Sequence, residues 1–266
     1  MSEGEFRQDW SAYAPAEHAV WRSLFHRQEE VLRGRACGEF LDGLEGLGVA
    51  ADGIPDFRRL NETLGAATGW SVVAVPGLVP DDVFFAHLAS RRFPSTCFIR
   101  RADQLDYLQE PDVFHDIFGH VPMLMNPVFA DYMEAYGKGG LKALGLHSLH
   151  YLARLYWYTV EFGLIATAKG PRIYGSGIVS SKGESIYCLE SPVPNRLGFD
   201  LLRVMRTDYR IDAFQESYFV IDSFDQLFAA TQPDFTPHYA TLAGLTDIEP
   251  GAVLASDRVI HRGKAA

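Results

Sequence analysis

Two histidines stand five positions apart in PDVFHDIFGHVPM, residues 111–123, a stretch that is otherwise mostly apolar. Imidazole nitrogens are frequent metal ligands, and the acidic side chains around His115 favour a bound cation. Five positions on a straight α-helix turn a side chain by about 140°, so His115 and His120 cannot share one helix face. They can converge if the helix stops between them, with Gly119 in the left-handed conformation and Pro122 preventing continuation. The alternative is two unconnected histidines, one packed and one exposed.

Glu161 is the candidate for a third ligand. It lies in LYWYTVEFGLI, residues 155–165, where aromatic and aliphatic side chains surround it on a predicted helix. A carboxylate in such company costs several kcal/mol unless it is paired or coordinated. One alternative is a buried ion pair with a basic residue. Two histidines and one carboxylate form the facial triad of non-haem iron(II) oxygenases, although the same set could hold catalytic zinc.

Composition excludes several classes of function. Hydrophobic residues make up 47% of the 266-residue chain, which is typical of a globular protein with a substantial core. The 24 basic and 34 acidic residues give a net charge of −10, which argues against nucleic acid as a partner. Three widely spaced cysteines favour reduced thiols in a cytoplasmic protein over disulfides or a zinc ribbon. The sequence shows neither a signal-peptide pattern nor an apolar run of about 20 residues, so we expect no membrane contact.

Helical spacing of apolar residues dominates the elements that must position these ligands. The longest predicted helix covers residues 147–170 and is apolar on nearly every face, so we expect it to be central. The other predicted helices lie at 20–32, 54–65, 80–93, 223–232 and 236–244. The Ser181-x-x-Glu184 pattern matches a capping box and predicts the start of another short helix.

Short strands are predicted at 70–77, 96–100 and 218–222, and the glycine-rich RIYGSGIVSS, residues 172–181, is typical of a hairpin or turn. These elements predict a mainly α-helical domain with small β-sheets, of the α+β class, without an alternating βαβ pattern. No linker-like stretch divides the chain, so we expect one domain over residues 1–266, with HRGKAA as a loose C-terminal tail.

Three stretches resemble the catalytic domain of the aromatic amino acid hydroxylases, namely EPDVFHDIFGHVPML, LYWYTVEFGL and IYGSGIVSSKGES. They occur in the order and spacing of that family, and the resemblance is closest to its short bacterial members that act on phenylalanine. It covers about residues 10–245 and implies that residues 1–266 form a single catalytic domain with its core in that range. It implies a non-haem iron(II) monooxygenase that uses a tetrahydropterin, such as tetrahydrobiopterin, and dioxygen. The reaction implied is hydroxylation of L-phenylalanine to L-tyrosine through an iron(IV)-oxo species.

The resemblance assigns roles to individual residues. The iron ligands of the family fall on His115, His120 and Glu161. Among the substrate-binding positions, Arg100 matches the arginine whose guanidinium binds the substrate carboxylate in a bidentate manner. Pro111, Trp157 and Phe162 match side chains that line the pocket for the substrate ring, and Ser180 matches a serine that hydrogen-bonds the substrate. The positions that contact the pterin or the iron-bound waters fall on Gly77, Val79, Phe84, Asp116 and Tyr156.

Two positions depart from the animal enzymes of the family. Asp116 stands where those enzymes carry glutamate, and Leu108 stands where they carry a hydroxyl residue. The chain also lacks a heptad pattern that would form a coiled coil, so we expect a monomer without substrate-activated allostery. The alternatives are the same family chemistry on tryptophan, a zinc-dependent hydrolase on the same ligands, or a non-enzymatic helical module.

Overall fold

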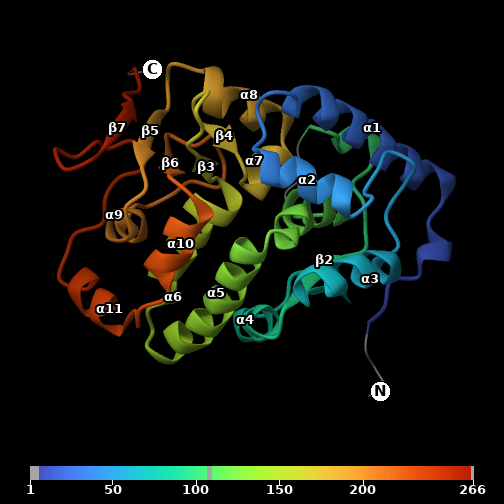
Figure 1. Ribbon diagram of the computed structural model, residues 1–266, viewed down its shortest axis with the longest axis horizontal. Coiled ribbons are helices and arrows are strands. Elements are labelled where there is room, and N and C mark those ends of the chain that lie inside the picture. Colours follow the sequence, from blue (N-terminus) through green and yellow to red (C-terminus); the bar gives the residue numbers. More distant parts are fainter. Residues whose placement is uncertain (1–5, 107–109, 265–266) are drawn as a thin grey trace.

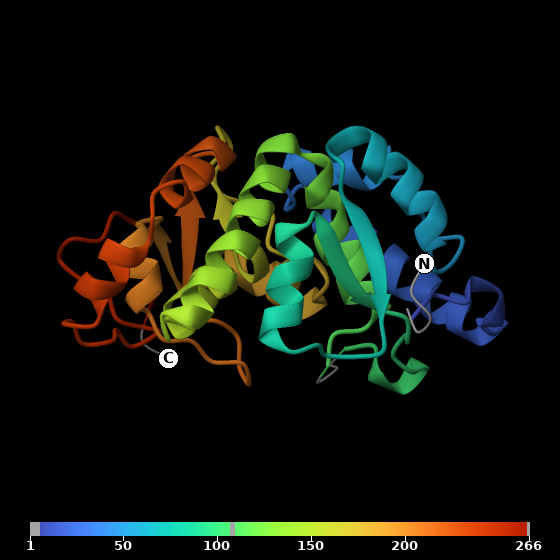
Figure 2. The same cartoon turned by 90° about the horizontal axis from the view of Figure 1, so that it is seen from below.

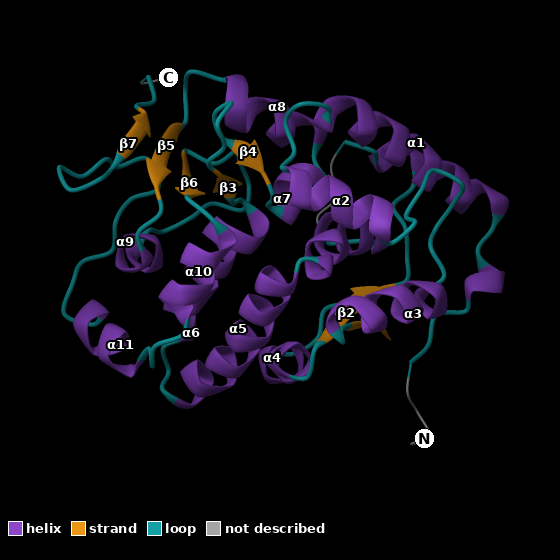
Figure 3. Cartoon of the chain, viewed as in Figure 1, coloured by secondary structure: helices purple, strands orange, loops and turns teal. Residues whose placement is uncertain are grey.

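The computed structural model of the chain describes residues 6–106 and 110–264. Helices form most of it, and the strands gather in two small sheets (Figure 3). The α-helices of the described ranges are α1 (Pro15–Leu32), α2 (Gly38–Gly46), α3 (Phe57–Thr68), α4 (Asp81–Ala89), α5 (Pro127–Gly145), α6 (Leu149–Tyr156), α7 (Ser176–Val179), α8 (Lys182–Glu190), α9 (Leu201–Arg206), α10 (Phe224–Thr231) and α11 (Thr236–Leu242). The expectation of a mainly helical domain with small sheets is confirmed.

Five short helical segments of other types complete the helical part of the described ranges. Three are 3-10 helices: η1 (Trp10–Ala12), η2 (Ala102–Gln104) and η4 (Val121–Met125). Two are π-helices: η3 (His115–His120) and η5 (Trp157–Glu161). Both π-helices carry candidate metal ligands, and π-helical turns occur frequently at functional sites.

The smaller sheet is a parallel pair, β1 (Ser71–Val75) and β2 (Arg92–Thr96), with Ser71 opposite Arg92 and Val75 opposite Thr96. Because α4 connects the two strands, this part of the chain is a βαβ unit. The sequence shows no βαβ pattern that alternates along the chain, so this unit was not expected. The strand predicted at 96–100 is misplaced, since β2 ends at Thr96.

The larger sheet has the order β4-β3-β6-β5-β7. Its strands are β3 (Leu164–Ile165), β4 (Arg172–Ile173), β5 (Asn195–Gly198), β6 (Ser217–Ile221) and β7 (Val259–His261). Every residue of the central strand β6 is buried, which confirms the strand predicted at 218–222. The hairpin or turn predicted at 172–181 is correct only at its start, where β4 pairs antiparallel with β3; it is wrong from Ser176, where helix α7 begins.

The C-terminal segment is held against this sheet. Strand β7 pairs antiparallel with β5, and the backbone nitrogens of Gly263 and Lys264 donate to Asn195 Oδ1 (2.8 Å) and Pro192 O (2.9 Å). The prediction of a loose tail is therefore wrong as far as Lys264. Residues 265–266 lie outside the described part of the chain.

Helix α5 lies in the middle of the molecule, between the larger sheet and the β1–β2 pair (Figures 1 and 2). Asn126 caps its N-terminus, because Oδ1 accepts from the backbone nitrogens of Val128 (3.0 Å) and Phe129 (3.1 Å). Two glycines let α4 pack closely on it. A Cβ atom at Gly137 would lie 2.3 Å from Ala89 N, and one at Gly140 would lie 2.0 Å from the Phe85 ring.

Five of the helices predicted from apolar spacing are confirmed, as α1, α3, α4, α10 and α11. The long helix predicted over 147–170 is wrong. The chain forms α6, then the π-helix η5, and leaves the helix at Phe162 to enter strand β3. A Cβ at Gly163 would lie 2.2 Å from Thr159 O, so the chain turns closely on itself at this point. Within the described ranges, no helix has the length and apolar character needed to cross a bilayer.

Candidate metal centre

The two histidines converge through a π-helix. The turn η3 runs from His115 to His120, and i→i+5 hydrogen bonding places residues five apart about one turn from each other. Their Nε2 atoms lie 3.1 Å apart. The predicted helix stop is wrong, since Gly119 is not left-handed and the chain continues into η4. The glycine has another role: a Cβ there would lie 3.0 Å from Ser176 O, where α7 packs against η3.

Aromatic packing between η3 and helices α1 and α2 holds this turn in place. Phe114 and Phe118 stack with ring centroids 4.8 Å apart and an interplanar angle of 11°. Trp21 of α1 contacts the first ring edge-on, and Phe40 of α2 contacts the second. Both phenylalanines are fully buried, and each contributes roughly 1.5–3 kcal/mol by leaving water. The π-helical turn is thus anchored by contacts with distant parts of the sequence.

Glu161 completes the cluster from the end of η5. Its Oε1 lies 3.2 Å from His120 Nε2, and its Oε2 lies 3.7 Å from His115 Nε2. The three ligand atoms all lie within 4.8 Å of one another. The alternative of an ion pair between Glu161 and a lysine or arginine is not what the structure contains, because the carboxylate faces the two imidazoles.

These separations fit a single metal ion. Ligand atoms about 2.1 Å from a metal and at right angles to each other are about 3 Å apart. The donor set of two imidazole nitrogens and one carboxylate suits iron(II) and leaves coordination positions on the other side of the ion. The side chains of His115 and Glu161 are 18% and 14% exposed, so the centre is open to small molecules.

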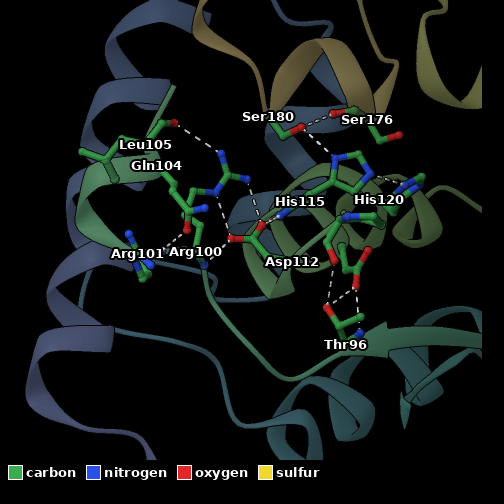
Figure 4. A network of polar contacts seen from close by, with 12 residues as sticks. Thr96, Arg100, Arg101, Gln104, Leu105, Asp112, His115, His120, Ser176 and Ser180 are labelled. Atoms are coloured by element: carbon green, nitrogen blue, oxygen red, sulfur yellow. Dashed lines mark hydrogen bonds and ion pairs between the residues drawn. The ribbon is translucent and has the colours of Figure 1, made fainter. Parts of the chain in front are cut away.

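Two serines contact the ligands, and Figure 4 shows Ser180 between His115 and Ser176. Ser180 Oγ donates its only proton to Ser176 O (2.7 Å), so it must accept from His115 Nδ1 (2.9 Å). This fixes the tautomer of His115: Nδ1 carries the proton and Nε2 presents its lone pair to the centre. Ser176 Oγ lies 2.9 Å from Glu161 Oε2 and 3.0 Å from Val160 O, so its single proton is shared between the carboxylate and a backbone carbonyl.

The protonation states suit metal binding. Burial lowers the pKa of His115 to about 4, although the charge of Glu161 opposes the shift. Burial alone would raise the pKa of Glu161, but the charge of His120, the hydrogen bond between them and His115 outweigh it and lower the pKa to about 2. At neutral pH the centre therefore offers a neutral imidazole at His115 and an ionised carboxylate.

Arg100 and Asp112 form a buried ion pair beside the centre (Figure 4). Arg100 Nε and Nη2 donate to the two oxygens of Asp112, each at 2.8 Å, and Asp112 Oδ1 also accepts from His115 N (3.1 Å). Burial would raise the pKa of Asp112, but the hydrogen bonds and charge of Arg100 hold it below the usual range. Asp112 therefore connects the predicted substrate-binding arginine to the backbone of a metal ligand.

Asp116 lies one position after His115 and is also buried. Its Oδ2 accepts from Thr96 N (2.8 Å) and Thr96 Oγ1 (3.0 Å), at the end of strand β2. Burial raises the pKa of Asp116 to about 7, although the bonds from Thr96 oppose the shift.

The other predicted site residues lie on elements around the triad. Trp157 begins η5, and Phe162 follows its end, with their ring centroids 4.7 Å apart. Pro111 lies just before η3, and its carbonyl oxygen is 3.3 Å from Thr96 Oγ1, the hydroxyl that also contacts Asp116.

The residues predicted to contact the pterin are spread over three elements. Tyr156 ends α6, and its ring lies between those of His120 (6.3 Å) and Phe84 (6.1 Å). Gly77 and Val79 lie in the loop between β1 and α4, the helix that carries Phe84. Leu108 lies outside the described residues.

The comparisons with known proteins agree with this geometry. The family model for biopterin-dependent aromatic amino acid hydroxylases matches residues 9–236. The phenylalanine-4-hydroxylase of Ralstonia nicotianae is 66% identical over 94% of this chain and 80% of that protein. The phenylalanine-4-hydroxylase of Chromobacterium violaceum is 64% identical over 96% of this chain and 86% of that protein.

Solved structures match equally well. The cobalt-bound phenylalanine hydroxylase of Chromobacterium violaceum superposes with a TM-score of 0.94, at 63% identity, over 96% of this chain and 92% of that chain. A structure of the same enzyme with iron and phenylalanine bound gives 0.92 at 61% identity, over 96% and 93% of the two chains. The chain belongs to the biopterin-dependent aromatic amino acid hydroxylases, and its single catalytic domain has the fold of these bacterial enzymes.

The sequence did not reveal several contacts that hold the ligands in place. Ser176 was missed, because residues 172–181 were assigned to a hairpin or turn and not to helix α7, where Ser176 lies four positions before the predicted Ser180. Asp112 was noted only as one of the nearby acids. The pairing of Asp116 with Thr96 joins residues 20 positions apart, and no local pattern signals such a contact.

Proposed function

We propose that this protein is a phenylalanine 4-monooxygenase that converts L-phenylalanine to L-tyrosine with iron(II), a tetrahydropterin and dioxygen. The observation that carries the proposal is the convergence of His115, His120 and Glu161, whose ligand atoms lie within 4.8 Å of one another. Support also comes from the names of the similar bacterial proteins and from the iron- and phenylalanine-bound relative.

The triad would hold the metal on one side. Ser180 keeps the proton of His115 on Nδ1, and Ser176 holds the carboxylate of Glu161, so both ligands are oriented before the metal binds. Iron and pterin, when bound, supply the activation of dioxygen. With substrate and pterin bound, the residues of the chain would exclude water from the centre and hold the substrate ring at a fixed place beside it.

Arg100 is the proposed partner of the substrate carboxylate. Its guanidinium has five N–H donors, of which two meet Asp112 and one meets Leu105 O at 3.3 Å. The remaining N–H groups, one on each Nη, can bind a carboxylate in the bidentate manner that arginine favours. Trp157, Phe162 and Pro111 would then enclose the aromatic ring.

The proposed pterin site lies on the side of His120 that faces Tyr156. Phe84 would stack on the pterin ring, with backbone contacts from Gly77 and Val79. Asp116 and Tyr156 would lie between the pterin and the waters on the metal. The chain of ring contacts from Phe84 through Tyr156 to His120 supports this arrangement.

One assay tests the proposed function. Protein loaded anaerobically with ferrous iron is mixed with a tetrahydropterin and L-phenylalanine, L-tryptophan or L-tyrosine, and air starts the reaction. We expect L-tyrosine as the main product, formed from phenylalanine, with no turnover when pterin or iron is left out. His115→Ala is expected to abolish the activity.

Other outcomes would identify another function. Preferential hydroxylation of tryptophan would show that the protein carries out the same chemistry with a different substrate specificity. Hydrolytic activity without oxygen or pterin, supported by zinc, would contradict the proposal. The monomeric state and the cytoplasmic location stay predictions, and light scattering on the purified protein tests the first.

A further inference from the structure

Three side chains hold the indole of Trp157. The Phe162 ring lies 4.7 Å away between centroids. Tyr209 stacks on the indole at 4.4 Å with an interplanar angle of 18°, and Gln215 Oε1 accepts from the indole Nε1 at 2.9 Å. Tyr209 and Gln215 belong to one loop, DYRIDAFQ, residues 208–215, which joins α9 to β6. None of the roles assigned above includes this loop.

The side-chain amide of Gln215 has a defined orientation. Gln215 is 4% exposed, and its Nε2 donates to Arg210 O (3.0 Å) and Ala213 O (3.4 Å). Both amide protons are therefore used within the loop, and Oε1 is left to accept from Trp157. The hydrogen-bond network selects this orientation of the amide.

The loop itself is attached at both ends. Tyr158, the residue after Trp157, donates from Oη to Asp208 O (2.6 Å). At the other end, Gln215 N donates to Glu184 Oε1 (3.2 Å), and the same oxygen accepts from Tyr218 Oη. Glu184 lies in α8 and Tyr218 in β6, so the loop is connected to the larger sheet as well as to η5.

We propose that Tyr209 and Gln215 are positioning residues that keep the Trp157 indole in one orientation as a rigid wall of the aromatic pocket. The loop 208–215, together with Trp157, then sets the size of ring that the site accepts. This inference rests on the proposed function, in which Trp157 encloses the substrate ring. A tryptophan without the stacked ring and the hydrogen bond can turn about its side-chain bonds, and the pocket then fits a larger ring at less cost.

The first test compares two aromatic ligands. Calorimetry under anaerobic conditions measures the Kd of L-phenylalanine and of L-tryptophan for the iron-loaded protein, and the Kd ratio expresses the selectivity. Gln215→Leu and Tyr209→Leu are each expected to lower the preference for phenylalanine by about tenfold. Tyr209→Phe keeps the stacked ring and is expected to restore most of the preference.

A matched control separates this effect from a general loss of structure. Gln226 accepts from the backbone nitrogen of Asp222 (2.7 Å) on the surface, away from Trp157. Gln226→Leu therefore makes the same chemical change in the first turn of helix α10 and is expected to leave the Kd ratio unchanged. Circular dichroism and the melting temperature of each variant show whether it is folded.

A double-mutant cycle asks whether Gln215 acts through the indole N–H. Trp157→Phe removes the donor and keeps an aromatic ring. Adding Gln215→Leu to Trp157→Phe is expected to change the Kd ratio by less than twofold, because the hydrogen bond is already gone. Equal effects of Gln215→Leu with and without the indole N–H would overturn the inference, as would a ratio that no loop variant changes.

Turnover gives an independent readout. The yield of tyrosine per tetrahydropterin oxidised is expected to fall in Gln215→Leu, because a loosely held ring is less often in place when the oxidant forms. A wild-type protein that binds phenylalanine selectively but does not hydroxylate it would refute the proposed function, and the Kd ratios would still decide the role of the loop.

Discussion

Ser180 carries a single hydroxyl proton, and the direction in which it points determines which nitrogen of His115 can bind a metal. The proton goes to Ser176 O, so the serine accepts from Nδ1 and leaves the Nε2 lone pair free. At the scale of single residues, the centre thus depends on side chains that never touch the metal themselves. Asp112 has a comparable position between Arg100 and the backbone of His115.

Ser180→Ala is expected to weaken iron binding by about 10- to 100-fold, because the orientation and tautomer of His115 are no longer fixed. Anaerobic titration with ferrous iron and a competing chelator measures the change. Ser185→Ala is the control, since Ser185 is also buried and donates to Ile178 O (2.7 Å) but contacts no ligand. Equal affinities for iron in Ser180→Ala and in the wild type would contradict the role given to this hydroxyl.

Asp112→Asn is expected to destabilise the protein by about 3 kcal/mol at pH 7, because it leaves the Arg100 charge buried and unpaired. The KM for phenylalanine is expected to rise by about tenfold, since Arg100 loses its fixed orientation. Because the folded pKa of Asp112 is lowered, its stabilising effect is complete above the unfolded value of about 4 and is lost as the pH falls below it.

Urea denaturation of wild type and Asp112→Asn at several pH values tests the predicted loss of stability and its pH dependence. The stability difference between wild type and Asp112→Asn should narrow below about pH 4. The exposed pair of Arg101 and Asp103 supplies the control, since Asp103→Asn should change neither stability nor KM measurably. A difference that grows as the pH falls would show that the Arg100–Asp112 pair is not its source.

At the scale of elements, two π-helical turns bring the ligands together, and α7 fits between them. Glycine at position 119 favours the close approach of α7 to η3, because a Cβ there would lie 3.0 Å from Ser176 O, a tight contact. Ser176 and Ser180 hold the ligands from α7, so the spacing between these two elements determines the geometry of the centre.

Gly119→Ala is expected to cost about 1–3 kcal/mol of stability through overpacking, and to weaken iron binding as α7 moves away from η3. Gly139→Ala is the matched change in a helix, since nothing lies within 4 Å of its Cβ position. There, alanine is expected to stabilise the protein by about 0.5–1 kcal/mol. Chemical denaturation and iron titration of both variants provide the comparison, and wild-type behaviour of Gly119→Ala would refute the close-packing argument.

The elements also show what the sequence could and could not predict. Apolar spacing located α1, α3, α4, α10 and α11, because each of them buries one face against the core. Apolar spacing failed over 147–170, where the backbone hydrogen bonds change from α-helical to π-helical and the chain then enters a strand. Both π-helices depend on partners far away in the sequence, such as Trp21 and Phe40 beneath η3, and no local periodicity shows these contacts.

The site was predicted unevenly for the same reason. His115, His120 and Glu161 could be chosen from residue type and from the cost of a buried carboxylate. The predicted way in which they converge was wrong. The residue types of Gly119 and Pro122 suggested a helix end, and they do not reveal the π-helical hydrogen bonds that form instead. Tyr209 and Gln215 come close to Trp157 only when β6 pairs within the larger sheet, so they were not found.

At the scale of the whole molecule, metal binding and folding are coupled, because the ligands come from η3 and η5, which are far apart in the sequence. Ferrous iron at 100 times its Kd is expected to stabilise the native state by about 2.7 kcal/mol. Thermal unfolding under anaerobic conditions, with and without a chelator, measures this gain. His115→Ala should lose it, whereas an equal gain in that variant would indicate metal binding elsewhere.

A second buried ion pair, Arg203 with Asp257, fastens the C-terminal segment. Arg203 Nε and Asp257 Oδ1 lie 2.9 Å apart, and the side chains are 6% and 4% exposed. Asp257→Asn is expected to lower stability by about 3 kcal/mol and to leave the KM for phenylalanine unchanged. Asp222→Asn, which breaks the exposed contact with Arg258, should have little effect on either quantity. A raised KM in Asp257→Asn would link this segment to the active site.

Strand β7 also forms the outer edge of the larger sheet, next to β5. It covers β5, whose four residues are all buried, and its three residues leave only a short outer edge. A chain cut before Val259 would present the unpaired backbone of β5 to solvent, and open strand edges of this kind recruit further strands. Shortened forms of the protein are therefore expected to aggregate even while their metal ligands stay intact.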